Sequence, residues 1–262
     1  MYECPVLRPA LIALLVSAAP LAAQADPLAG GIAAMEHWDL AAARTLLTEA
    51  VRRDPGSYEA NWRLAHVLVD LGKVVPDSLP DAARDSLYAL AESYARRGVA
   101  ANPDGADGHF VLANAIGRVA LTKSKRERVE GAVEIRNEAL KALGLDPTHA
   151  GAHHVLGRWH AEIQRLSSVE RFFARTFLGA SIFNLASWDS AERHLRLAVQ
   201  HDPGRIFHYL DLGEVYLDRE KWAEARTTFE AIERLPIVEP MDTEYKRTAA
   251  RHLSALAERT GS

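Results

Sequence analysis

The sequence predicts an all-α protein built as a solenoid of repeated helix pairs, and two observations carry this prediction. The first is a set of helix stops at intervals of 44 to 56 residues. The residue before a proline is pushed out of the helical region and proline cannot donate to the preceding turn, so each stop ends a helix. The stops are Asp54-Pro55, Asn102-Pro103, Asp146-Pro147 and Asp202-Pro203. The second observation is a small residue that recurs at one register after each stop.

This small residue follows a leucine in every repeat. The occurrences are Leu64-Ala65 with Leu68, Leu112-Ala113 with Ile116, Leu156-Gly157 with His160, and Leu212-Gly213 with Tyr216. A second set, ahead of the prolines, contains Ala43 with Leu47, Ala191 with Leu195, and Ala225 with Phe229. Both sets match a pattern that is typical of the tetratricopeptide repeat, namely Leu-Gly-x-x-Tyr followed by Ala-x-x-x-Phe and then by Pro. Small residues are needed there because the paired helices approach closely.

The spacing of the stops predicts insertions, because a tetratricopeptide repeat has a period of about 34 residues. The extra residues fall at 73–83, 121–131 and 166–186. Gly31 occupies the small-residue position of a first repeat over about residues 26–57. The predicted fold is therefore a tetratricopeptide-like right-handed helical solenoid with insertions between repeat helices, extending over residues 26–262.

The amino end predicts a signal peptide over residues 1–25. Arg8 precedes an apolar run at residues 11–21 that is too short to span a bilayer, and small residues stand at Ala23 and Ala25. Cleavage before Asp26 would export the protein to the periplasm or the medium, with no transmembrane segment left; an uncleaved membrane anchor is the alternative. Cys4 is the only cysteine, so the mature chain is predicted to lack disulfides, Cys-ligated zinc and Cys nucleophiles.

Composition and motifs favour a binding protein over an enzyme. The net charge of −4 gives no broad positive field for a phosphate backbone, so nucleic acid is not an expected partner. A Gly-rich phosphate loop, His-Glu-x-x-His and Gly-x-Ser-x-Gly are all absent from the sequence. No catalytic residue and no cofactor are predicted.

Four histidines, His149, His153, His154 and His160, lie within twelve positions. His149 and His153 have the helical spacing of metal ligands, but no third ligand is evident. His153 and His160 fall on positions that pack helix pairs together. A structural role is therefore favoured over a metal site, and no metal site is predicted.

Two inserted segments leave alternatives open. Lys123, Lys125, Arg126 and Arg128, with Arg118 upstream, form a basic run that could meet an anionic lipid or an acidic protein. Interleaved Glu127 and Glu130 favour a solvated helix connection.

In the next insertion, one helical face carries Val169, Phe172, Phe173, Thr176 and Phe177. Packing of this face over the neighbouring helix pair is favoured, ahead of an apolar ligand cavity and, last, a membrane-surface helix.

Particular runs of the chain resemble the regulator of microtubule dynamics family. The first run is Leu156-Gly157-Arg158-Trp159, followed by Leu166-Ser167 and Val169-Glu170-Arg171. The second begins with residues 110–117 and extends to Leu145-Asp146-Pro147. The third extends from Tyr209-Leu210-Asp211-Leu212-Gly213 to Leu235-Pro236. The likeness covers roughly residues 56–258. It implies an α-helical repeat domain and adaptor roles, in eukaryotes at microtubules and organelle membranes. This chain departs from that family in its export signal.

The register also predicts a binding surface. In such a solenoid the first helix of each pair lines the concave face, and residues four apart share a helix face. Counting from each small residue, positions minus three, plus one and plus five form the expected groove row. It contains Trp62, His66 and Asp70; Phe110, Asn114 and Arg118; His154, Arg158 and Glu162; and Leu210, Glu214 and Asp218.

This mixture of aromatic and charged side chains predicts a scaffold whose groove holds a protein or peptide partner. A carrier or tether for a lipid or another apolar ligand is the alternative function. Arg158 is the candidate anchor, because its guanidinium can hold a carboxylate or phosphate through two hydrogen bonds. The alternative for Arg158 is a structural ion pair with Glu162 or the next repeat.

Overall fold

The computed structural model describes residues 26–75, 81–177 and 181–260, which form helices and no strand. The predicted signal peptide lies outside the described residues. In chain order the elements are α1 (Pro27–Glu36), α2 (Leu40–Arg53), α3 (Tyr58–Lys73), α4 (Ala82–Ala101), α5 (Ala106–Ala120), α6 (Lys125–Leu145), α7 (Ala150–Arg165), α8 (Ser168–Phe177), the 3-10 helix η1 (Ser181–Leu185), α9 (Trp188–His201), α10 (Ile206–Asp218), α11 (Trp222–Arg234) and α12 (Asp242–Thr260).

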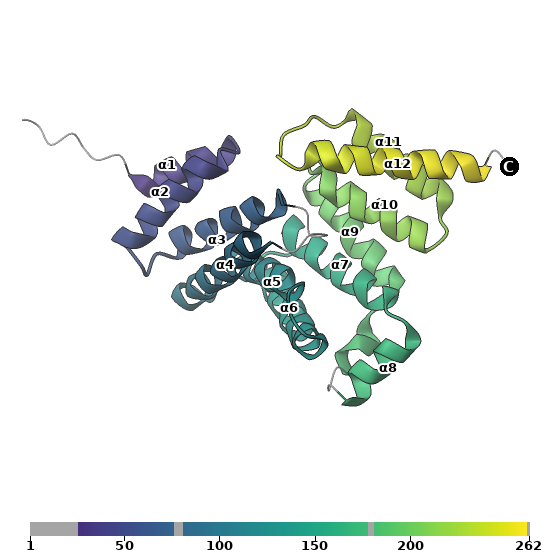
Figure 1. Cartoon of the computed structure of the whole chain (residues 1–262), viewed down its shortest axis with the longest axis horizontal. Helices are drawn as coiled ribbons and strands as arrows, with labels where there is room; N and C mark the ends of the chain where they lie inside the picture. Colours follow the sequence, from purple (N-terminus) through teal and green to yellow (C-terminus); the bar gives the residue numbers. More distant parts are fainter. Residues whose placement is uncertain (1–25, 76–80, 178–180, 261–262) are drawn as a thin grey trace, which may run out of the picture.

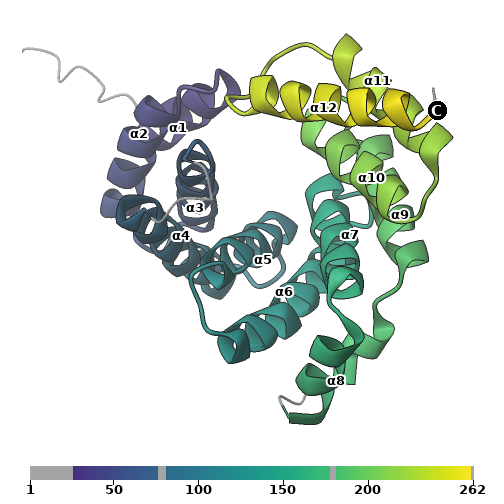
Figure 2. The same cartoon turned by 45° about the vertical axis from the view of Figure 1, so that its right-hand side comes forward.

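The helices pack as five pairs followed by a final helix. The pairs are α1 with α2, α3 with α4, α5 with α6, α7 with α9, and α10 with α11, and α12 packs on the last pair (Figure 1). In Figure 2 the helices follow a strongly curved path, with α3, α5, α7 and α10 on its inner side. The predicted tetratricopeptide-like solenoid is confirmed, and the first helix of each of these pairs lines the concave wall.

The glycines at the small-residue register confirm why that position stays small. A Cβ on Gly31 would lie 2.7 Å from Leu47 of the partner helix, and a Cβ on Gly157 would lie 2.6 Å from Leu195. Gly213 meets the ring of Phe229 even more closely. Cβ atoms do not approach other carbons at such distances, so a side chain here would separate the helices.

A second repeated feature fixes where the first helices begin. Asn61, His109 and His153 each stand four positions before the small residue and contact the carbonyl oxygen of the proline six residues earlier. Nitrogen-to-oxygen distances are 3.0, 2.7 and 3.0 Å respectively. Since a carbonyl only accepts, each side chain must donate, which ties the start of a helix to the preceding stop.

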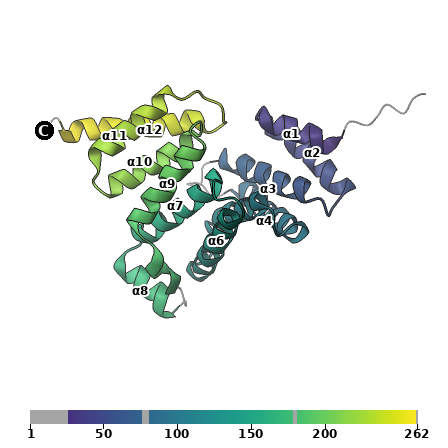
Figure 3. The same cartoon turned by 180° about the vertical axis from the view of Figure 1, so that it is seen from behind.

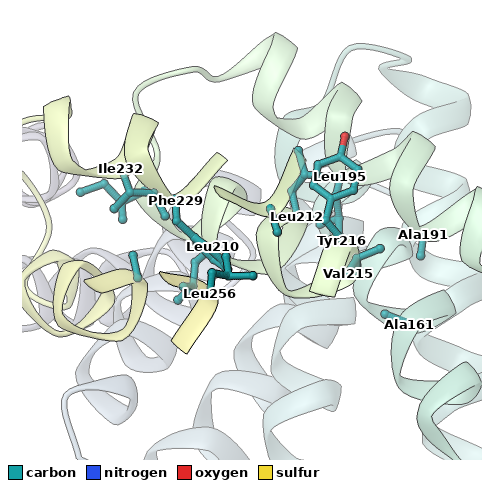
Figure 4. Packing of buried hydrophobic residues seen from close by; sticks show 13 residues of the cluster. Ala161, Ala191, Leu195, Leu210, Leu212, Val215, Tyr216, Phe229, Ile232 and Leu256 are labelled. Atoms are coloured by element: carbon teal, nitrogen blue, oxygen red, sulfur yellow. The ribbon is translucent and has the colours of Figure 1, made fainter. Parts of the chain in front are cut away.

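The apolar core runs between the two helix layers. Figure 4 shows its carboxy-terminal part, where Leu210, Phe229 and Leu256 of α10, α11 and α12 converge. Phe229 and Leu195 are fully buried, as their contacts with the register glycines require. Burial of such side chains stabilises the stack by roughly 1.5–3 kcal/mol each.

The insertion that contains α8 differs from the favoured expectation. Val169 and Phe172 were expected to pack over the neighbouring helix pair, but they are 65% and 51% exposed. That prediction is wrong for these two residues, because α8 extends from the body and packs mainly against η1 (Figure 3). The side chains of Phe173 and Phe177 lie outside the described residues, as does that of Lys125 in the basic run.

Two cations of the exposed basic run pair with acidic neighbours on the same helix start. Arg126 pairs with Glu130 at 3.0 Å and Lys123 with Glu127 at 3.8 Å. Ser124 and Glu127 form a capping box that starts α6. Within the described ranges no helix is long and apolar enough to cross a bilayer.

Candidate functional site

The concave wall brings together charged side chains from α7 and α10. Asp211 lies at their centre, on the face of α10 that meets α7. His154 Nε2 donates to its carboxylate at 3.0 Å, and Arg158 Nε lies 3.5 Å from the same oxygen. Burial opposes ionisation of Asp211, but the charge of Arg158 and the hydrogen bond from His154 outweigh it and lower the pKa of this carboxyl. The wall therefore holds a fixed negative charge at this point.

Arg158 serves two carboxylates at once. Besides Asp211, it lies 3.6 Å from Glu162 one turn along α7. The negative charge of Asp211 is the main cause that raises the pKa of the Arg158 guanidinium. Its side chain still keeps 45% of its surface exposed. The structural ion pair with the next repeat is thus present, and a solvent-facing edge of the guanidinium remains.

A pair of histidines backs this cluster. His154 Nδ1 and His208 Nδ1 are 3.0 Å apart. Because Asp211 can only accept, His154 carries its proton on Nε2 and accepts at Nδ1, so His208 donates. Burial lowers the pKa of His208 to about 2 and also lowers the pKa of His154. Both rings are therefore neutral near pH 7.

Next along the wall, Arg165 links the ends of the same two helices. Its guanidinium contacts Glu162 and Asp218, each at 2.7 Å, and lies 3.8 Å from Glu214. Burial and then the charge of Asp211 raise the pKa of Glu214 to about 7. Glu214 consequently changes its charge close to neutral pH.

The other half of the wall is aromatic and weakly charged. The edge of the His66 ring meets Phe110 with 5.9 Å between ring centroids, and Phe110 lies 4.8 Å from the ring of His149. Asp70 pairs with Lys73 at 2.8 Å and lies 3.6 Å from His66. These contacts run from α3 to α5 and on to the start of α7.

The two ends of the solenoid meet across the concave side. A small crevice is lined by Trp38, Asp70 and Lys73 from the first two pairs and by residues 239–241 and Tyr245 from the carboxy-terminal part. The Arg205 guanidinium lies 5.3 Å from the centroid of the Trp38 ring, and Arg205 also pairs with Glu239. The chain thus curls back on itself until its first and last pairs are in contact (Figure 2).

The predicted groove row is placed as follows. His66, Asp70, Phe110, His154, Arg158, Glu162, Glu214 and Asp218 contribute to the contacts just described. Asn114 and Arg118 are partly buried on α5, and the charge of Arg118 acts to lower the pKa of Tyr245, which burial raises.

Trp62 and Leu210 do not belong to this surface. Each is only 7% exposed and lies in an apolar cluster, Trp62 among residues of α4 and α5 and Leu210 with α11 and α12. Their placement on the groove surface has to be corrected, because the side chain of Trp62 packs against α4 and α5 and that of Leu210 against α11 and α12.

Several wall residues were missed by sequence reasoning. They are Trp38, Lys73, Arg165, Arg205, Phe207, His208, Asp211, Glu239, Tyr245 and His252. Asp211 stands two positions before Gly213, outside the row counted from the small residues, and it joins the wall only through the way α10 packs against α7. The residues where the two ends of the solenoid meet, such as Trp38, Arg205 and Glu239, carry no sequence signal within any single repeat.

The four clustered histidines separate in space. His149 Nδ1 accepts from the amide of Ala152 and caps α7, whereas His154 faces the concave wall. His153 and His160 are buried, as the structural interpretation predicted, and both lie against His194 of α9. In the part of the chain that the structure describes, no three His, Cys, Asp or Glu side chains are grouped to hold a metal ion.

Comparison with known proteins identifies a family. The sequence model described as "Regulator of microtubule dynamics protein 1-3" matches residues 22–257. Regulator of microtubule dynamics protein 3 of Rattus norvegicus and that of Bos taurus are each 24% identical to this chain over 192 residues. Each match covers 71% of this chain and 39% of the relative. The chain therefore spans about two fifths of the length of these curated relatives.

Solved structures share the architecture. A thermophilic TPR protein of Thermus thermophilus superposes with a TM-score of 0.61 at 23% identity, over 87% of this chain and 97% of that chain. The pilF protein of Pseudomonas aeruginosa superposes with a TM-score of 0.50 at 14% identity, over 89% of this chain and 88% of that chain. At these identities the likeness shows the fold alone.

Proposed function

We propose, for a chain that belongs to the regulator of microtubule dynamics protein 1-3 family, that its concave wall holds an extended segment of a protein partner. The protein then acts as a non-catalytic scaffold. The observation that supports this most directly is the row of ionised side chains on α7 and α10 that remain partly open to solvent. Arg158 is 45% exposed, Glu162 54% and Asp218 32%.

An extended polypeptide suits such a wall because its main chain offers donors and acceptors along its whole length. Arg158, Glu162 and Arg165 alternate in charge along two turns of α7, and Asp218 of α10 pairs with Arg165, so a bound segment meets both signs over a short distance. His66 and Phe110, whose rings meet edge to face and are only partly buried, supply aromatic contacts further along. Recognition would therefore combine a few aromatic contacts with charged groups at fixed spacing.

A lipid or other apolar ligand is the second candidate occupant. The charged α7–α10 wall gives it less support, since burying hydrocarbon there would desolvate several ionised groups without replacing their hydrogen bonds. The aromatic half formed by His66 and Phe110 is the part that suits such a ligand.

One comparison tests the two occupants. The intact protein, purified from its native host, is analysed both for co-purifying polypeptides and, after solvent extraction, for bound lipid by mass spectrometry. Stoichiometric polypeptide with no stoichiometric lipid is the expected result. Stoichiometric lipid in a preparation free of other polypeptides would instead assign the wall to the carrier function.

We also propose that the protein works in the cell envelope, either in the periplasm or as a secreted protein. Support comes from the apolar run at residues 11–21 and from Ala23 and Ala25. Mature protein from the native host is expected to begin at or close to Asp26. Recovery of intact Met1 in the soluble cytoplasm would contradict export.

A further inference from the structure

One end of the molecule takes no part in the concave wall. It consists of the α5–α6 connection with the start of α6 (residues 121–128), α8 with the residues before it (166–177), and η1 (181–185); we call this the insertion end. Its three stretches carry six Lys or Arg and two Glu, in a chain whose net charge is −4. The insertion end is thus a local positive region on an acidic protein.

Apolar side chains stand exposed on the same end. Val169 and Phe172 of α8 are 65% and 51% exposed, Leu185 of η1 is 55% exposed, and Leu121 is 49% exposed. A single exposed leucine needs no explanation, but four large apolar side chains on one end form a patch.

Local interactions hold α8 in place. Ser167 Oγ accepts from the Glu170 amide at 3.2 Å, and the Glu170 carboxylate accepts from the Ser167 amide at 3.0 Å, which forms a capping box. Arg171 donates to the carbonyl of Gln164 at 2.9 Å and so fastens α8 to the end of α7. The helix is therefore formed and anchored while Val169 and Phe172 face solvent.

The basic and apolar parts are neighbours. Val129 and Ala132 near the start of α6 pack in one cluster with Leu166 and with Ile182 of η1. Figures 1 and 2 both show α8 beside the lower end of α6, directed away from the rest of the body. An approaching flat surface would meet both parts together.

We propose that the insertion end docks on a lipid surface that carries anionic headgroups. Phe172 and Val169 enter at the level of the headgroups, while Lys123 and Arg126 attract the negative charge. The ion pairs of these two cations with Glu127 and Glu130 are exposed and cost little to break. A second copy of the chain suits this surface poorly, since two regions of net positive charge would face each other. The inference is independent of what the concave wall holds.

Co-sedimentation with vesicles tests this inference on the full chain. Vesicles of phosphatidylglycerol mixed with phosphatidylcholine are expected to pellet the protein, and vesicles of phosphatidylcholine alone are not. Phe172→Glu is expected to lower the partition coefficient by about tenfold or more, the loss expected when one buried phenylalanine is removed. Lys123→Glu with Arg126→Glu is also expected to cost about tenfold or more, and added salt should release the wild type.

Matched controls keep the test specific. The control for Phe172→Glu is Leu90→Glu on α4, where the side chain is 46% exposed. The control for the charge reversals is Arg52→Glu with Arg247→Glu, where the side chains are 72% and 68% exposed. Both controls should leave vesicle binding unchanged. Thermal melting followed by circular dichroism checks that each variant folds. The proposal is overturned if the wild type stays in solution with anionic vesicles, or if Phe172→Glu binds as well as wild type. A Phe172-dependent dimer in sedimentation without lipid would also overturn it and assign the patch to a second copy.

Discussion

Arg158 forms ion pairs within the wall and still keeps part of its side chain exposed. It lies between Asp211 of the next repeat and Glu162 of its own helix, at 3.5 and 3.6 Å. Neither distance is that of a tight hydrogen bond, and nearly half of the side chain remains exposed.

Replacing Arg158 should therefore affect binding more than folding. Arg158→Ala is expected to weaken capture of the partner by about 1–3 kcal/mol, the range for losing a charge-assisted contact at an interface. The free energy of unfolding should fall by about 1 kcal/mol, because Arg158 itself is largely exposed and the mostly buried Asp211 keeps its hydrogen bond from His154. Both quantities can be measured on the same preparation. Lost stability with undiminished capture would show that the residue only supports the scaffold.

The buried histidines make stability depend on pH. Burial lowers the pKa of His160 to about 4 and that of His208 to about 2, against about 6.5 in an unfolded chain. Below about pH 6.5 the unfolded chain therefore binds protons that the folded chain does not, and stability falls as the pH decreases.

Urea unfolding between pH 7 and pH 5 measures this effect. His208→Gln should lose less stability over that range than the wild type, by up to about 1.4 kcal/mol per pH unit. The exposed His37→Gln variant is the control and should keep the wild-type slope. Equal slopes for His208→Gln and wild type would mean that His208 is not buried as a neutral ring.

At the scale of elements, close approach within each helix pair is the feature that sequence specifies best. Gly157 and Gly213 lie against Leu195 and Phe229 with no room for a Cβ. Gly157→Leu or Gly213→Leu should destabilise the protein by several kcal/mol, roughly the upper range for overpacking. Gly144→Leu on α6 is the control, since no atom lies within 4 Å of its Cβ position. If thermal melting is unchanged for both register variants, the helix-pair register is wrong.

The prolines and small residues predicted the helix pairs because each is a local or nearest-neighbour constraint. Asp54-Pro55 ends α2 through its own backbone, and Gly157 needs only its partner helix. The orientation of α8 was not predictable in the same way. Its apolar face indicates that burial is favourable, but whether a neighbour covers Phe172 depends on the lengths of the connections on both sides.

The concave wall was predicted in part for a related reason. Residues such as Arg158 and Glu162 follow from the register of one helix. Asp211 requires knowledge of how the next repeat is rotated, and the contact of Arg205 with Trp38 requires the curvature of the whole solenoid. Trp62 shows the opposite error, because its position in the register matched the groove while α4 and α5 offered it an apolar site.

At the scale of the whole molecule, curvature determines how a partner reaches the wall. Trp38 adopts a left-handed backbone conformation with φ of 56°, and Glu220 does the same seven residues after its own register glycine. This conformation is costly for a bulky side chain. The ring of Trp38 has its centroid 5.3 Å from the Arg205 guanidinium, where the first helix pair approaches the start of α10. A segment bound along the wall would lie inside this closed curve.

Site-specific photo-crosslinking shows whether a partner polypeptide lies against the concave wall, as we propose. A photoreactive residue is placed at Glu162 on α7 or at Arg52 on the outer helix α2, where the side chains are 54% and 72% exposed. Illumination in extract of the native host should give a discrete polypeptide adduct from position 162 and none from position 52. Equal adducts from both positions, or an adduct from position 52 alone, would contradict the claim.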